Sequence, residues 1–164
     1  MDDQIQDLQD KYADNFKNQV FVPADFTGKQ AVIDDILNLS ARVIYLREMR
    51  AQSQLTGAGQ SANKQNLLMQ KESEIGGQIF GQVAQGEQRS FFCLDKNTWI
   101  WYEAWVDQTT HKPVNQTTRY EITSAGVAKS SQISSYQMLE GRELENFYNA
   151  VKVYCLMVEQ KIYS

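Results

Sequence analysis

Apolar positions recur at three- and four-residue steps in the first third of the chain. One series consists of Ile5, Leu8, Tyr12 and Phe16, and a broader series spans residues 32–49. This period places apolar side chains along one face of a helix. The pattern therefore predicts two N-terminal helices, and the breadth of the second series predicts that its helix packs against neighbours on two sides.

Polar and small residues replace this pattern at about residues 52–63. The stretch "QLTGAGQSAN" lacks apolar periodicity, which is typical of a mobile loop. Helical character returns in "QNLLMQKESEI" and then meets Gly76, Gly77 and Gly81. Each glycine costs about 1 kcal/mol relative to alanine inside a helix, so we expect this segment to bend or break. Residues 1–89 form the predicted helical part of the chain.

From Ser90 onward the apolar period changes from helical to two. The runs "SFFCLD", "TWIWYEAWVD", "TTRYEITS" and "VAKSS" are strand-like and are separated by turn-forming residues. They predict an antiparallel meander of three to four strands over about residues 90–138. The segment after Gly141 regains a clear helical period, which predicts a C-terminal amphipathic helix packed on the sheet. We expect one α+β domain over residues 1–164, with residues 90–164 forming the meander and the closing helix.

The charge of the chain narrows the classes of partner. Its 16 basic and 20 acidic residues give a formal charge of −4, and the basic residues are scattered. Nucleic acid and anionic membranes need a concentrated basic face. No apolar run reaches the ~18 residues of a membrane span, and the acidic start "MDDQIQDLQD" is unlike a signal peptide. We expect a cytoplasmic protein with no nucleic-acid partner and no membrane insertion.

Chemistry-bearing residues are few. Cys93 and Cys155 each lie among apolar neighbours, so buried thiols are the favoured interpretation, and a disulfide stays open. The single His111 has no evident nucleophile or orienting partner, and one His with two separated Cys gives too few ligands for zinc. The sequence therefore predicts no catalytic residues, no metal site and no cofactor.

The three tryptophans of the chain are the strongest candidate site residues. Trp99, Trp101 and Trp105 share one face of a predicted strand with Glu103. Pairing this strand with "TTRYEIT" so that Glu103 faces Arg119 collects Ile100, Tyr102, Tyr120 and Ile122 on the other face, which is the better sorting of apolar residues. The sequence thus predicts a charge pair among indoles, on the more polar face of the sheet.

Two interpretations of the tryptophan face stay open. In the first, the helices cover it and the indoles belong to the core. In the second, it forms an aromatic groove that takes a peptide, a partner helix or a small amphipathic ligand. We expect a non-catalytic protein-interaction module, binding another protein or a second copy of itself through its helices and aromatic sheet face. The alternative is a small-ligand or peptide carrier with its pocket between the tryptophan face and the helices.

Four runs in the C-terminal half carry a resemblance to a known family. The runs "FFCLDKNTWIWYEAW", "TTRYEI", "GVAK" and "LEGRELENFYNAVKVY" resemble an uncharacterised small domain of predicted proteins from Saccharibacteria, which are host-dependent bacteria with small genomes. The spacing of "FFCLD", "TWIWYE" and "TTRY" is its most specific part. The resemblance implies that the meander and closing helix form one unit and that the source is bacterial. It brings no known activity, cofactor or ligand.

Overall fold

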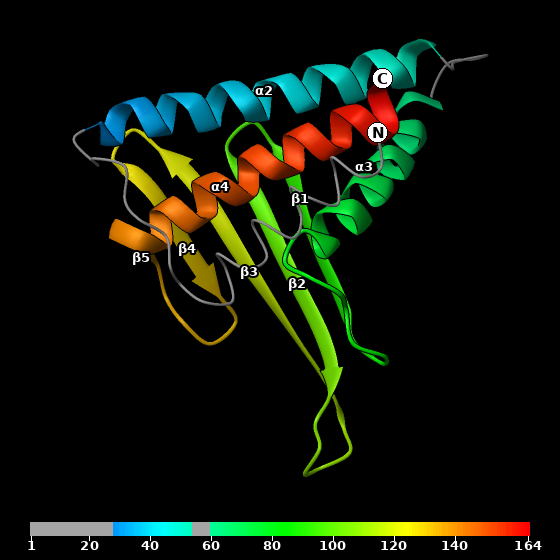
Figure 1. The fold of residues 1–164 in the computed structure, drawn as a ribbon, viewed down its shortest axis with the longest axis vertical. Coiled ribbons are helices and arrows are strands. Elements are labelled where there is room, and N and C mark those ends of the chain that lie inside the picture. The colour runs from blue at the N-terminus through cyan, green and yellow to red at the C-terminus, as the bar shows by residue number, and fades with distance from the viewer. Residues whose placement is uncertain (1–27, 54–59) are drawn as a thin grey trace.

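The computed structural model describes residues 28–53 and 60–164. Helices precede a sheet, and a further helix closes the chain (Figure 1). The elements are α2 (Lys29–Ser53), α3 (Gln60–Gln78), β1 (Gln88–Asp95), β2 (Thr98–Val106), β3 (Pro113–Thr123), β4 (Gly126–Ser131), β5 (Gln137–Met138), α4 (Gly141–Val158) and the π-helical turn η1 (Glu159–Tyr163). The helix expected from Ile5 to Phe16 lies outside the described residues.

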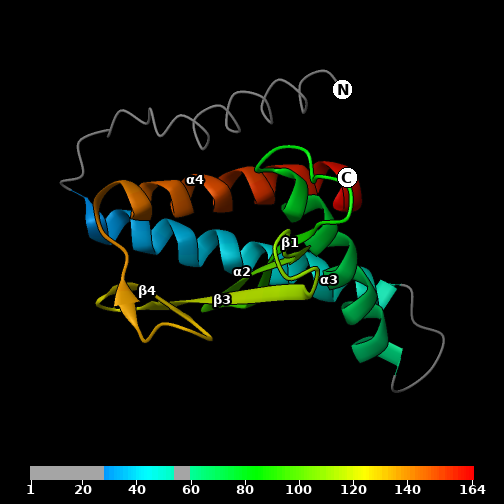
Figure 2. The same cartoon turned by 90° about the horizontal axis from the view of Figure 1, so that it is seen from below.

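The elements form two layers. The strands make one antiparallel meander in the order β1-β2-β3-β4-β5, and α4 and α2 lie together on one of its faces (Figures 1 and 2). α3 packs beside β1 at the edge of the sheet. Among the described residues no helix covers the opposite face (Figure 2). The predicted α+β class, with a closing helix on an antiparallel sheet, is confirmed.

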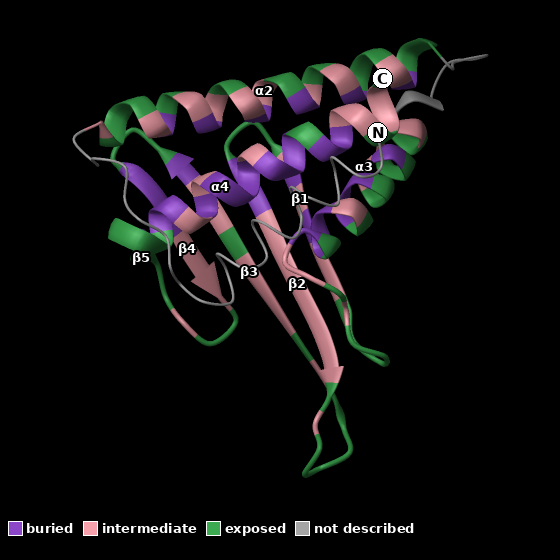
Figure 3. Cartoon of the chain, viewed as in Figure 1, coloured by how far each residue is buried: buried purple, intermediate pink, exposed green. Residues whose placement is uncertain are grey.

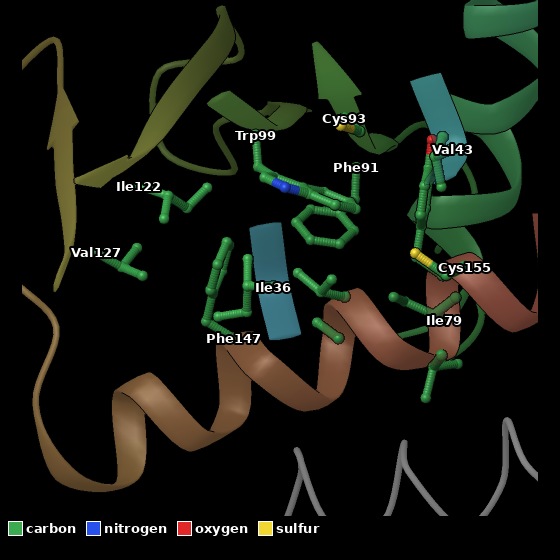
Figure 4. Packing of buried hydrophobic residues seen from close by; sticks show 14 of the residues in the cluster. Ile36, Val43, Ile79, Phe91, Cys93, Trp99, Ile122, Val127, Phe147 and Cys155 are labelled. Carbon is green, nitrogen blue, oxygen red and sulfur yellow. The ribbon is translucent and has the colours of Figure 1, made fainter. Parts of the chain in front are cut away.

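The core lies between the helices and the sheet face that they cover (Figures 3 and 4). It joins residues from both halves of the chain, and those seen in Figure 4 include Ile36, Val43, Ile79, Phe91, Cys93, Trp99, Ile122, Val127, Phe147 and Cys155. Both cysteines are free and buried, as the favoured interpretation predicted. Burial raises the pKa of the Cys93 thiol to about 12 and also raises that of Cys155, so neither thiol ionises near neutral pH.

α3 departs from its prediction at its start. It begins at Gln60, and α2 continues to Ser53, so the expected loop at 52–63 is too long at both ends, while its centre at 54–59 lies outside the described residues. α3 continues through Gly76 and Gly77 and ends at Gln78, so the helix breaks within the expected segment, just before Gly81 with its φ of 105°. A Cβ atom at Gly76 would lie 1.8 Å from the carbonyl oxygen of Phe91, and one at Gly77 would lie 2.0 Å from that of Arg89. These glycines therefore allow the helix backbone to approach β1 directly.

The predicted register between β2 and β3 is wrong. Glu103 lies opposite Gln116, and Arg119 lies opposite Ile100 on the face away from the helices. Trp99 is paired with Tyr120, so the tryptophan face is the covered face and Tyr120 belongs to it. The tryptophans of β2 therefore share a face with Tyr120, and Arg119 shares the other face with Ile100, which is the arrangement that the alternation of apolar residues disfavoured.

A six-residue connection explains this register. Asp107 donates its backbone N–H to the carbonyl oxygen of Lys112 at 2.9 Å, and its side chain accepts the N–H groups of Thr109 and Thr110 at 2.7 Å and 2.9 Å. β3 therefore begins at Pro113, four residues before the predicted strand. Because β2 is apolar on both faces, alternation alone could not show which face the helices cover.

Candidate functional site

The three tryptophans lie in different environments along β2. Trp99 is fully buried, and its ring stacks on Phe91 with 5.2 Å between ring centroids. Its indole N–H donates to the Ser40 hydroxyl of α2 at 2.9 Å. Trp99 is therefore a core residue, and its buried N–H is satisfied. Trp101 and Trp105 lie farther along the strand and are only half-buried.

Glu103 lies between these two tryptophans, and its neighbours differ from those predicted. The indole N–H of Trp101 donates to the Glu103 carboxylate. On the neighbouring strand the residue opposite Glu103 is Arg89, whose guanidinium lies 5.9 Å from the centre of the Trp101 ring. A cation at that distance from an indole is within range of a cation–π contact. The predicted arginine on the tryptophan face is therefore Arg89 of β1 and not Arg119.

Arg119 does not reach the tryptophan face. Its guanidinium donates to the Glu121 carboxylate at 2.8 Å, and the hydroxyl of Tyr136 donates to the same carboxylate at 3.0 Å. Hydrogen bonds from Arg119 and Tyr136 hold the pKa of Glu121 below its ordinary value. This cluster belongs to the outer face of the sheet, which separates Arg119 from the other predicted site residues.

An aromatic hollow opens between α4, the segment that follows α3, and strands β1, β2 and β3. Its volume is about 200 Å³, and it is lined by Phe80, Phe91, Trp101, Tyr120, Phe147, Ala150, Glu143 and Asn146. Phe80 meets Trp101 edge to face at 4.4 Å between ring centroids, and Tyr120 stacks on Phe147 at 4.6 Å. The strands β1, β2 and β3, the helix α4 and the segment that follows α3 thus supply one ring each. We call this site the aromatic hollow.

A second hollow continues from the first along β2. It has a volume of about 440 Å³ and is lined by Phe80, Glu87, Gln88, Arg89, Trp101, Glu103, Ala104 and Trp105. Phe80 and Trp101 line both hollows, so the two form one surface, which we call the aromatic groove. The helices leave this part of the sheet open because the β2–β3 hairpin extends beyond them (Figure 1).

The electrostatics of the groove centre on Tyr120. Burial raises the pKa of Tyr120 to about 12, and the carboxylates of Glu143 and Glu103 add to this rise. The phenol is therefore protonated at neutral pH and can donate a hydrogen bond. Lys129 pairs with one oxygen of Glu143. The lining of the groove thus combines aromatic rings with three carboxylates, Glu87, Glu103 and Glu143, and one cation, Arg89.

A buried ion pair escaped the sequence analysis. Arg47 of α2 donates to the Glu72 carboxylate of α3 at 2.7 Å and to the carbonyl oxygen of Cys93 at 2.8 Å. Desolvation opposes the charge on Arg47, but Glu72, together with Tyr154 and Cys93, offsets it, and the pKa of Arg47 is raised. Arg47 follows the buried Val43 by four residues, and Glu72 follows the buried Leu68 by four. This helical spacing was the signal in the sequence that could have placed both charged residues on buried helix faces.

Arg47 also lines a cleft of about 600 Å³ between α2, α3 and the β1–β2 turn. Since its guanidinium already bonds Glu72 and Cys93, the pair joins α2, α3 and β1 and is a structural feature. His111 is exposed in the β2–β3 turn, with a φ of 56°. In the part of the chain that the structure describes, no three His, Cys, Asp or Glu residues are placed to hold a metal ion.

Comparison with known proteins gives no relationship: no family model, no curated protein and no solved structure matches this chain. The resemblance to a Saccharibacterial domain therefore stays a prediction. Across residues 28–53 and 60–164, no helix is both long and apolar enough to cross a membrane.

Proposed function

We propose that this protein is a non-catalytic interaction module whose aromatic groove binds a segment of another protein. The observation that carries this proposal is that Trp101 and Trp105 are half-buried in one continuous groove, whereas Trp99 of the same strand is fully buried. Exposed aromatic surface in a concave site is a common feature of interaction surfaces, and tryptophan is enriched among residues that dominate binding energy.

The shape of the groove favours a segment of polypeptide. The two hollows follow β2 from Trp101 to Trp105, and Phe80 and Trp101 line both. An elongated, open groove can take successive side chains of a peptide, each in a separate hollow. The backbone of that segment would cross the rim, where Gln88, Glu103 and Asn146 offer polar atoms.

A second candidate function is the carriage of a small amphipathic ligand. The aromatic hollow favours it, because five rings surround a volume of about 200 Å³ with Glu143 and Asn146 at the rim. Apolar walls with a few polar groups are the usual composition of small-molecule sites. Native mass spectrometry of freshly purified protein separates the two functions, since a carrier retains a ligand of small mass and an interaction module does not.

The proposed function is tested by selecting random dodecapeptides on the immobilised protein and measuring their binding by fluorescence anisotropy. Asn146→Phe fills the aromatic hollow without removing a core ring, and Trp105→Ala removes the far wall of the groove. We expect each substitution to weaken binding about tenfold or more. The matched control Asn146→Ser keeps a small polar residue and should bind as the wild type does. Selected peptides that bind all variants equally would place the interaction elsewhere and reject the proposal.

A further inference from the structure

We propose that the aromatic hollow recognises a cationic side chain, so that the segment bound by this module is basic. This inference rests on the proposed function and adds the chemistry of the partner to it. The hollow joins ring faces and carboxylates in a space suited to one side chain.

The rings of the hollow favour a cation. Phe80 and Trp101 form one wall, Tyr120 and Phe147 form another, and Phe91 lies between them, 5.6 Å from Phe80 and 6.4 Å from Phe147 by ring centroids. The faces of aromatic rings carry negative electrostatic potential and attract ammonium and guanidinium groups, with indole the strongest. The chain already places one cation, Arg89, over the Trp101 ring from the side of the second hollow.

The carboxylates at the hollow also favour a cation. Glu143 lines the aromatic hollow and Glu103 lies beside it, and both act electrostatically on the Tyr120 hydroxyl within it. An apolar side chain entering the hollow would take water from these carboxylates and return no interaction, which is costly. An anionic side chain would be repelled. A cation compensates the lost hydration, and it can share Glu143 with Lys129, whose ammonium contacts a single carboxylate oxygen.

The size of the hollow favours a single side chain. Pockets for drug-sized molecules have volumes of about 300–1,000 Å³, whereas this hollow has about 200 Å³. It therefore suits the end of one side chain and is smaller than the usual pocket for a drug-sized molecule. Lysine, arginine and methylated lysine each carry their charge at the end of an unbranched apolar stem, which the rings can cover while Glu143 faces the charge.

The experiment uses two probes that differ in charge alone. One is the amide of Nα-acetyl-Nε-trimethyllysine, and the other is its neutral analogue with carbon in place of the ammonium nitrogen. The indole N–H signal of Trp101 is followed by two-dimensional NMR in the full chain and is assigned by its loss in Trp101→Phe. We expect the cationic probe to shift this signal saturably, and the neutral analogue to bind about tenfold more weakly or worse.

Three variants locate the effect. Glu143→Gln should weaken the cationic probe about fivefold, and Asn146→Phe should abolish the shift by filling the hollow. Glu48→Gln removes the same charge from an exposed position at the other cleft and should leave binding unchanged. NMR spectra of each variant show whether it is folded, and Glu143 is itself half exposed, so its replacement by glutamine is compatible with folding.

Each other outcome overturns the inference. Equal binding of the two probes would show that the hollow takes apolar groups without regard to charge, and the interaction function would stand. Absence of a saturable Trp101 shift with either probe would reject the hollow as a side-chain site. Failure of the proposed function is seen separately, when selected peptides ignore both Asn146→Phe and Trp105→Ala.

Discussion

The Arg47–Glu72 pair is the most deeply buried charge pair in the described chain, with side-chain exposures of 2% and 0%. We expect Glu72→Gln to lower the free energy of unfolding by about 3–5 kcal/mol, because the guanidinium is left buried without its counter-charge. The double variant Arg47→Met, Glu72→Gln removes that charge and should be more stable than Glu72→Gln alone. Urea denaturation measures both. Equal stability would show that the Arg47 bond to the Cys93 carbonyl, and not the charge pair, is the dominant contribution.

Part of the candidate site could be predicted from the sequence, residue by residue. It placed Trp101, Glu103 and Trp105 on one face, because strand alternation depends on neighbouring residues only. It assigned the arginine of that face to β3, where Arg119 occurs, although β1 supplies it through Arg89. Cross-strand partners depend on the length and hydrogen bonds of the turns, and the alternation of apolar and polar residues carries no information about either. Phe80, Tyr120 and Phe147 were missed for the related reason that they meet only in the folded chain.

The Asp107 turn sets the register of the β2–β3 hairpin and gives it a pH dependence. Hydrogen bonds from the backbone N–H groups of Thr110 and Thr109 hold the pKa of Asp107 below its ordinary value of 3.8. A lowered pKa means that the ionised carboxylate stabilises the turn above pH 3.8, and that this contribution is lost as the pH falls through the lower, folded value. We expect the Thr109 and Thr110 amide NMR signals to titrate with a midpoint below 3.8.

Asp107→Asn serves as the control for this titration. Its side-chain oxygen can accept the same hydrogen bonds without ionising, so the two amide signals should keep their positions across that range. If they move in the variant as in the wild type, another group is responsible for the titration.

The contact between α3 and β1 depends on two glycines. Because an added Cβ would overlap backbone oxygen at either position, the helix must move away from the strand. We expect Gly76→Ala and Gly77→Ala each to lower the free energy of unfolding by about 1–3 kcal/mol or more, despite the better helix propensity of alanine. Gln78→Ala, at an exposed position of the same helix, should be neutral or slightly stabilising. Thermal and urea denaturation test all three, and stabilised glycine variants would contradict the close contact.

Elements were predicted well where a long periodic segment exists and poorly where a distant contact decides. The strands and α4 follow from period two and period 3.6, respectively. The low helix propensity of glycine correctly indicates that Gly76 and Gly77 destabilise an isolated helix. Propensity takes no account of the carbonyl oxygens of Phe91 and Arg89, which leave no room for a Cβ atom at these two positions.

At the scale of the whole molecule, α4 tests whether the two halves of the chain unfold as one unit. Val151 is fully buried and Leu156 is exposed on the same helix. We expect Val151→Asp to cost on the order of 4 kcal/mol or more through an unpaired buried charge, with the near-ultraviolet tryptophan signal and the far-ultraviolet helix signal lost together. Leu156→Asp should leave both signals intact. Separate transitions for the two signals would contradict a single cooperative domain, which stays a prediction of the sequence.

The layered arrangement itself follows from the change of period at Ser90, which separates helices from an antiparallel sheet. Which face of the sheet the helices cover was not predictable, because Ile100 and Tyr102 make the outer face of β2 nearly as apolar as the inner one. The buried side was decided by Trp99, Tyr120 and Ile122 together, in a register fixed by the Asp107 turn.

The fit of α3 against β1 also limits how this chain can assemble. A strand at the border of a sheet ordinarily offers its free backbone groups to a foreign strand, which is the route to strand-exchanged dimers and cross-β fibrils. Here the helix backbone at Gly76 and Gly77 lies over the Phe91 and Arg89 carbonyl oxygens. The opposite border, β5, has only two residues. Growth of the sheet by strand addition is therefore disfavoured along β1, where the helix backbone occupies the border of the sheet.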